Sequence, residues 1–113
     1  MHEMSLAEGV LQVIEDNAKT NGFSRVKTVW LEIGELAGVE VEAMRFCFDS
    51  VVKGTLAGGA RLEIVATQGR GRCLTCGETV PIQLRYDPCP LCGSYPVEQT
   101  GGLEMRVKEL EVE

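Results

Sequence analysis

Residues 73–93 read CLTCGETVPIQLRYDPCPLCG and hold four of the five cysteines of the chain. Cys73 and Cys76 form one Cys-x-x-Cys pair, and Cys89 and Cys92 form a second pair 12 residues further on. A glycine follows each pair and permits the positive φ that a tight turn there requires. Two such turns present four thiolates that can converge in a tetrahedron, so the spacing predicts a structural zinc site.

Three other uses of these cysteines stay open, namely two disulfides, a rubredoxin-like single-iron centre and a redox dithiol. A thioredoxin-like dithiol requires a helix N-terminus behind the first cysteine of a pair, and no helical pattern follows either pair. The odd number of cysteines and the lack of a secretory signal favour a reducing, cytoplasmic setting. Cys47 stands alone in a predicted helix, where we expect a small, half-buried apolar residue.

Outside the cysteine region, the hydrophobic pattern changes period several times along the chain. Residues 5–21 predict an amphipathic helix, opened by the S-x-x-E capping box of Ser5 and Glu8. Helical spacing returns in residues 40–53, and alternation predicts three strands, at 25–33, around 62–66 and at 103–112. The alternation slips by one residue near Lys108-Glu109, which indicates a bulge in the last strand.

These elements predict an α+β fold with two helices packed on a three-stranded sheet and an inserted zinc-ribbon subdomain. The glycines at 69–71 and 101–102 mark the boundaries. We therefore expect a discontinuous body of residues 1–68 and 102–113, and a ribbon of residues 69–101. The chain has 11 Lys and Arg against 17 Asp and Glu, for a net charge of −6. Residues 69–101 contain as many basic as acidic residues, so the negative charge of the chain lies in the body.

The composition argues against several classes of function. No run of about 18 apolar residues is present, so we expect no membrane-spanning helix. A sequence pI near 4.8, without a stripe of Lys and Arg, is a poor basis for binding nucleic acid or an anionic membrane. The chain has no Cys–His pair, no Ser–His–Asp set and no phosphate-binding loop, so we expect it not to be an enzyme.

The only histidine is His2, at the second position of the chain. The Met1 α-amine, the His2 amide nitrogen and the imidazole Nδ1 can close adjacent chelate rings around one ion. Such a nitrogen array favours square-planar Ni(II) or Cu(II), and Glu3 can add its amide or carboxylate. The alternative interpretation is a frayed terminus ahead of the first helix.

Four stretches of the sequence together resemble the HypA/HybF family of hydrogenase maturation nickel metallochaperones, over essentially the whole chain. They are the Met1-His2-Glu3 start, WLEIGE at residues 30–35, the two cysteine pairs, and GGLEMRVKELEV at residues 101–112. The resemblance implies a nickel site at the N-terminus and a separate zinc site. It makes His2 the essential nickel ligand, with the Met1 amine and the Glu3 backbone or side chain beside it, and Glu40, in the loop after the first strand, as a further acidic ligand.

The same resemblance implies partners and a cellular role. Members hand Ni(II) to the precursor of the [NiFe]-hydrogenase large subunit together with the GTPase HypB, and some also serve urease maturation. We expect a cytoplasmic monomer or homodimer that carries Ni(II) as cargo and Zn(II) as a structural ion at Cys73, Cys76, Cys89 and Cys92. The alternative functions are a zinc-ribbon adaptor that delivers no metal and a rubredoxin-like iron electron carrier.

Overall fold

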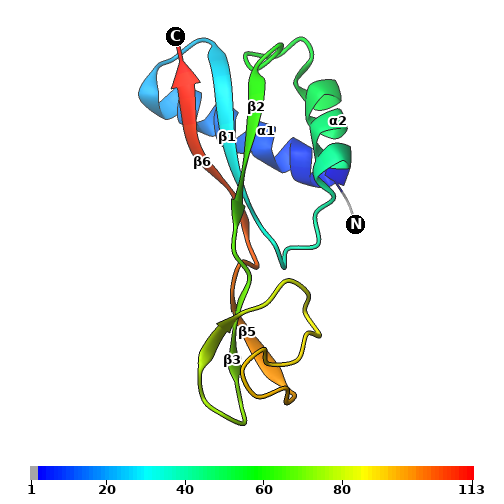
Figure 1. Ribbon diagram of the computed structural model, residues 1–113. Helices are drawn as coiled ribbons and strands as arrows, with labels where there is room; N and C mark the ends of the chain where they lie inside the picture. Colours follow the sequence, from blue (N-terminus) through cyan, green and yellow to red (C-terminus); the bar gives the residue numbers. More distant parts are fainter. Residues whose placement is uncertain (1–2) are drawn as a thin grey trace. The chain divides into compact units, whose positions relative to one another are not determined.

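The computed structural model describes residues 3–113 (Figure 1). Its elements are α1 (Glu3–Asn21), β1 (Val26–Gly34), α2 (Val41–Val52), β2 (Arg61–Thr67), β3 (Arg70–Cys73), β4 (Thr79–Pro81), β5 (Val97–Gly101) and β6 (Met105–Val112). They form two compact units. The first comprises the described residues up to Leu31 with Val39–Val65 and Arg106–Glu113, and the second comprises Glu32–Gly38 with Ala66–Met105. No helix among the described residues is long and apolar enough to cross a membrane.

The first unit has two helices and a three-stranded sheet in the order β2-β1-β6. β1 is the central strand, and α1 passes behind the sheet in the view of Figure 1. Each helix buries one stripe spaced at the helical period, and β1 adds its inward-facing residues; the buried set is Ala7, Val10, Ile14, Val29, Leu31, Met44, Phe48 and Val52. The predicted α+β class, with two helices on a three-stranded sheet, is confirmed.

The start of the first helix differs from the prediction. α1 already includes Glu3, so Ser5 lies inside the first turn and not at the N-cap that the S-x-x-E pattern predicted. An acidic residue in the first turn is stabilised by the positive end of the helix dipole, which gives Glu3 a favourable place there. The three predicted strands, β1, β2 and β6, and the second helix lie within one or two residues of their predicted bounds, whereas β3, β4 and β5 were not predicted.

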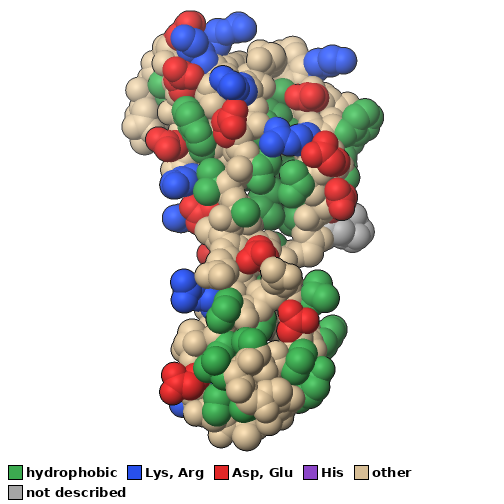
Figure 2. Space-filling view, viewed as in Figure 1, with side chains coloured by type: hydrophobic (Ala, Val, Ile, Leu, Met, Phe, Trp, Pro, Cys, Tyr) green, Lys and Arg blue, Asp and Glu red, His purple; other side chains and the backbone are tan. Residues whose placement is uncertain are grey.

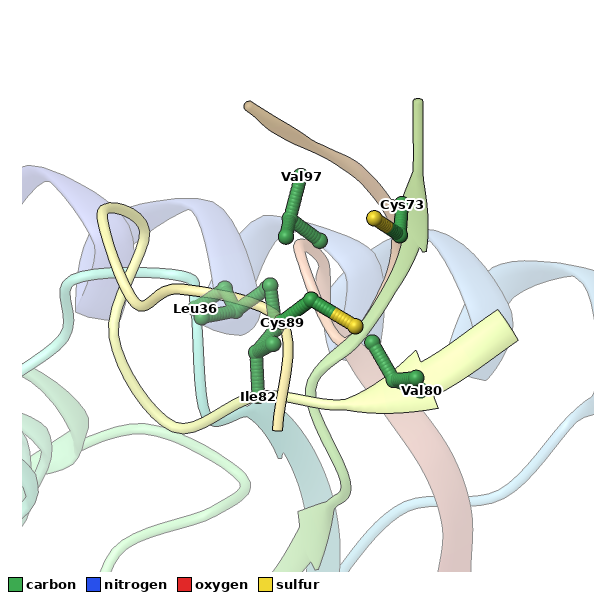
Figure 3. Packing of buried hydrophobic residues seen from close by; sticks show 6 residues of the cluster. All are labelled: Leu36, Cys73, Val80, Ile82, Cys89 and Val97. Atoms are coloured by element: carbon green, nitrogen blue, oxygen red, sulfur yellow. The ribbon is translucent and has the colours of Figure 1, made fainter. Parts of the chain in front are cut away.

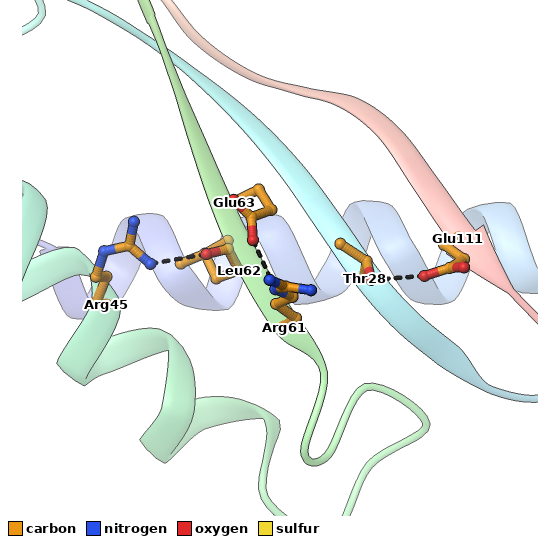
Figure 4. A network of polar contacts seen from close by, with 6 residues as sticks. All are labelled: Thr28, Arg45, Arg61, Leu62, Glu63 and Glu111. Carbon is orange, nitrogen blue, oxygen red and sulfur yellow. Dashed lines mark hydrogen bonds and ion pairs between the residues drawn. The ribbon is translucent and has the colours of Figure 1, made fainter.

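Figure 4 shows polar contacts of the first unit, and one of them joins two strands of its sheet. The Thr28 hydroxyl of β1 donates to the Glu111 carboxylate of β6 at 2.7 Å, and Thr28 is buried beneath this contact. Along β6, Val107 and Leu110 are half-buried, while the residues between them are exposed. The inward-facing positions therefore move from odd to even numbers, which is the slip of phase that the sequence indicates.

The second unit has its own three-stranded antiparallel sheet in the order β4-β3-β5. Its core is one small cluster of buried side chains (Figure 3): Leu36, Cys73, Val80, Ile82, Cys89 and Val97. Leu36 comes from the segment after β1 and is 2% exposed. This contact explains why Glu32–Gly38 belongs to the second unit, although the sequence pattern places these residues in the body.

The two units differ in surface character. Figure 2 shows Lys, Arg, Asp and Glu side chains interspersed over the first unit, and hydrophobic side chains gathered over the second. The exposed large apolar residues of the second unit are Leu74, Leu84, Tyr86, Leu91, Tyr95 and Leu103. Two of them, Leu74 and Leu91, lie inside the Cys-x-x-Cys pairs.

A close approach of two glycines brings Leu36 to this core. The Leu36 amide donates to the Gly102 carbonyl at 2.8 Å, and the Gly34 amide donates to the Glu104 carbonyl at 2.9 Å. A Cβ on Gly34 would overlap the Gly102 carbonyl, and Gly102 itself has φ +73°. Only residues without a side chain fit at this crossing, because the two backbones are in direct contact.

We predict that Gly34→Ala lowers the free energy of unfolding by about 2 kcal/mol or more, because the new methyl group forces the two backbones apart. Urea denaturation followed by circular dichroism measures the change. Gly9→Ala is the matched control: Gly9 lies in α1 with open space around its Cβ position, so alanine should stabilise by about 1 kcal/mol there. If Gly34→Ala and Gly9→Ala change the free energy of unfolding equally, the close backbone contact at Gly34 does not stabilise the fold.

Candidate metal centre

The four paired cysteines converge on one point of the second unit. Their sulfur atoms all lie within 4.8 Å of one another. The Cys73 and Cys92 sulfurs are 3.6 Å apart, and the Cys76 and Cys89 sulfurs are 3.8 Å apart. A tetrahedron with metal–sulfur bonds of about 2.3 Å has sulfur–sulfur edges of about 3.8 Å. The arrangement thus fits a zinc ion, with one ligand from each cysteine.

Tight turns position the sulfurs. In the first pair, the Cys76 amide donates to the Cys73 sulfur at 3.4 Å, and the Gly77 amide donates to the Cys73 carbonyl at 2.9 Å. In the second pair, the Gly93 amide donates to the Cys89 carbonyl at 2.7 Å. Gly77 and Gly93 have φ of 78° and 72°, which is the positive φ predicted for the residue after each pair.

Burial divides the four ligands into two kinds. The first cysteine of each pair, Cys73 or Cys89, is buried in the core of the second unit, whereas Cys76 and Cys92 are exposed. One side of the cluster is therefore anchored in the core (Figure 3). Four thiolates complete a tetrahedral coordination shell and leave no position for water or substrate, which is the pattern of a structural site.

The thiols of the first pair ionise at very different pH values. The hydrogen bond from the Cys76 amide is the largest reason that the pKa of Cys73 falls from 9.0 to about 6. At Cys76, a hydrogen bond from the Glu78 amide favours the thiolate, but desolvation and the Cys73 and Cys89 sulfurs outweigh it and raise the pKa to about 11. Metal binding must therefore displace a proton from Cys76 near pH 7, so metal affinity falls as the pH is lowered.

Cys47 takes no part in this cluster. It is half-buried in α2, as expected for a small apolar residue. None of the five cysteines forms a disulfide in the structure.

The structure describes two of the four residues predicted to bind nickel. Met1 and His2 are outside the described residues. Glu3 and Glu40 lie together, because the Glu40 amide donates to a Glu3 carboxylate oxygen at 3.2 Å. Glu40 is also the N-cap of α2, where its side chain accepts from the Glu42 amide at 3.3 Å. The sequence prediction missed this capping role, since Glu is not among the residues that usually cap helices.

Fold and site together define a class of protein: a small α+β metal-binding protein with a four-cysteine, zinc-ribbon-like centre. The family model described as "Hydrogenase/urease nickel incorporation, metallochaperone, hypA" matches residues 1–112. The chain therefore belongs to the HypA family of nickel metallochaperones for hydrogenase maturation.

Individual relatives agree with this assignment. The chain is 61% identical to the hydrogenase maturation factor HypA of Azotobacter chroococcum mcd 1 and 59% identical to that of Dechloromonas aromatica (strain RCB), each over the full length of both proteins. The solution structure of the Ni metallochaperone HypA from Helicobacter pylori matches with a TM-score of 0.73 at 29% identity. That match covers 99% of this chain and 97% of the other.

We predict that Cys73→Ser removes the zinc ion and unfolds the second unit, because a buried ligand and a core residue are lost together. Elemental analysis gives the metal content, and amide NMR signals show which unit loses structure. Cys47→Ser is the control and should keep one zinc per chain. Iron in place of zinc in the untreated protein would favour the rubredoxin-like interpretation, and full zinc in Cys73→Ser would contradict the four-thiolate site.

Proposed function

We propose that this chain captures Ni(II) at its N-terminus and delivers it for [NiFe]-hydrogenase maturation in the cytoplasm. The Met1 amine, the His2 amide and the His2 imidazole provide nickel ligands, and Glu3 and Glu40 add acidic ligands beside them. The four cysteines hold a structural zinc ion. The function is binding and transfer of an ion rather than catalysis.

The observation that carries this proposal is membership of a nickel metallochaperone family along residues 1–112, which includes the Met-His-Glu start. The contact between Glu3 and Glu40 supports it, because it holds the first turn of α1 against the start of α2. Two carboxylates next to the predicted nitrogen ligands supply negative charge for a divalent cation. Carboxylate oxygens are ligands that a divalent cation of this kind accepts.

The chemistry of the proposed ligands suits transfer. An amine, an imidazole and an amide must all lose protons to bind nickel, so acid releases the ion. A partner protein can also replace these ligands one at a time. We propose that the recipient is the precursor of the hydrogenase large subunit and that the GTPase HypB assists the transfer. The family description names urease together with hydrogenase, so urease maturation proteins are further candidate recipients.

We predict that His2→Ala abolishes Ni(II) binding but leaves the zinc content and the fold intact, because the imidazole is the one strong side-chain ligand of the proposed site. Isothermal titration calorimetry measures nickel binding, and elemental analysis measures zinc. A second variant carries extra residues before Met1, which removes the free amine and should weaken nickel binding. Unchanged nickel stoichiometry in His2→Ala would overturn the proposal.

The part played by Glu40 is tested by Glu40→Gln. Glutamine keeps an oxygen that can accept from the Glu42 amide, so α2 keeps its cap while the negative charge is removed. We predict nickel affinity about tenfold lower, because a neutral amide is a poorer ligand than a carboxylate. Glu42→Gln, which removes a charge from the same turn, is the control. If both variants weaken nickel binding equally, Glu40 acts through net charge and not as a ligand.

A further inference from the structure

The four-cysteine cluster faces solvent on one side. Cys76 and Cys92 are exposed, whereas the first cysteine of each pair is buried in the core of the second unit (Figure 3). The two turns that hold the cysteines, residues 73–77 and 89–93, contain no charged side chain. A small neutral molecule can therefore reach the two exposed cysteines without entering the core and without meeting a charged side chain of either turn.

Two of the sulfurs are close enough to form a disulfide after a small movement. A zinc-bound cysteine is a thiolate, and the thiolate is the form that peroxides oxidise. The first product is a sulfenic acid, which condenses with a neighbouring thiol to a disulfide. The Cys92 and Cys73 sulfurs are 3.6 Å apart. Since a disulfide bond is about 2.05 Å long, the two atoms must approach by only about 1.5 Å.

The chain holds these two cysteines differently. Cys73 ends β3, which pairs with β4 on one side and with β5 on the other, so its position is fixed by the sheet. Cys92 lies in residues 82–96, which form neither helix nor strand, and it can move toward Cys73 without disturbing the sheet. The other exposed cysteine, Cys76, lies in the short turn between β3 and β4, and its sulfur is 3.8 Å from that of Cys89.

We propose that the cluster is a reaction site for hydroperoxides, in which Cys92 attacks the peroxide and Cys73 resolves the product. The Cys92 sulfur forms a bond to one peroxide oxygen, the oxygen–oxygen bond breaks, and the leaving oxygen takes up a proton. The Cys73 thiolate then attacks the Cys92 sulfur, a sulfur–sulfur bond forms, and hydroxide leaves and is protonated to water. The two thiolates together lose two electrons, and hydrogen peroxide is reduced to water.

The disulfide has a direct consequence for the metal centre. It removes two of the four thiolates, and the remaining two cannot complete the tetrahedral shell of a structural zinc ion. Loss of the ion removes its contribution to the folding of the second unit. Disulfides in reducing compartments are usually transient and redox-sensing, and a dithiol can reduce this one by exchange. The reaction uses the zinc site alone and does not depend on nickel binding.

Hydrogen peroxide added to the zinc-loaded, nickel-free Cys47→Ser protein tests the proposal. This substitution leaves the four cluster cysteines as the only thiols of the chain. A zinc-binding dye follows release of the ion, and we expect equal amounts of zinc released and peroxide consumed. Dithiothreitol followed by zinc should restore the starting protein. Retention of zinc at a peroxide concentration that oxidises the thiols of the zinc-free protein would overturn the proposal.

Peptide mapping identifies the bond that forms. Trypsin cuts after Arg72, Arg85 and Arg106, so the two Cys-x-x-Cys pairs fall in separate peptides. A disulfide between Cys73 and Cys92 joins the two peptides, whereas a disulfide within a pair leaves them apart. Mass spectrometry after the free thiols are blocked should find the joined peptides with this bond. Disulfides within a pair, or sulfinic and sulfonic acids as the main products, would contradict the mechanism.

Two matched variants test the assignment of Cys92. Cys92→His and Cys76→His, each made in the Cys47→Ser protein, both keep a zinc site of three cysteines and one histidine. Cys92→His should release zinc about tenfold more slowly, because the attacking thiolate is lost. Cys76→His keeps Cys92 and Cys73 and should release zinc as fast as the parent protein.

Zinc content and circular dichroism, measured before peroxide is added, establish that each variant is folded and loaded. Equal release rates in the two variants would overturn the role of Cys92. If either variant fails to hold zinc, the peptide map of the Cys47→Ser protein decides between a bond from Cys73 to Cys92 and bonds within the pairs.

Discussion

The close backbone contact between Gly34 and Gly102 is the constraint on which the second unit depends. It fixes the segment after β1 beside the segment before β6 through hydrogen bonds at Gly34 and Leu36. Leu36 thereby reaches a core to which the cysteine region contributes the other members. A side chain at Gly34 or Gly102 would separate the two backbones. The core would then lose Leu36, the one member that precedes the cysteine region in sequence.

Even with Leu36, that core is small, so the second unit needs the metal site for its stability. Six buried residues cannot offset the conformational entropy of a unit of this size, and domains below about 70 residues usually need a metal, disulfides or a partner to fold stably. Cys73 and Cys89 belong to the core and to the ligand set at once. We therefore expect metal binding and folding of this unit to be coupled, as they are in domains that a structural zinc ion stabilises.

Sequence reasoning succeeded where one local pattern was sufficient. Hydrophobic period located α1, α2, β1, β2 and β6 because it is a local property of each element. Cys-x-x-Cys spacing located the four-cysteine cluster because the turn itself brings two sulfurs together. It failed where distant segments decide the outcome. The place of Leu36 in the second core depends on tertiary structure, and no local pattern indicates it. The short strands β4 and β5 carry too few residues to show a period.

The two proposed metal sites differ in how readily the ion must exchange. We propose that the chain uses different ligands in different units for the two ions. A transferred ion must be exchangeable, which nitrogen and oxygen ligands from one short segment allow, because each can be protonated or replaced separately. A structural ion must not exchange, and soft thiolates shared with a core resist exchange because loss of the ion unfolds the unit. Mixed ligands would let nickel compete for the structural site. The lone histidine therefore belongs far in sequence from the cysteines, and the ribbon closes its shell without it.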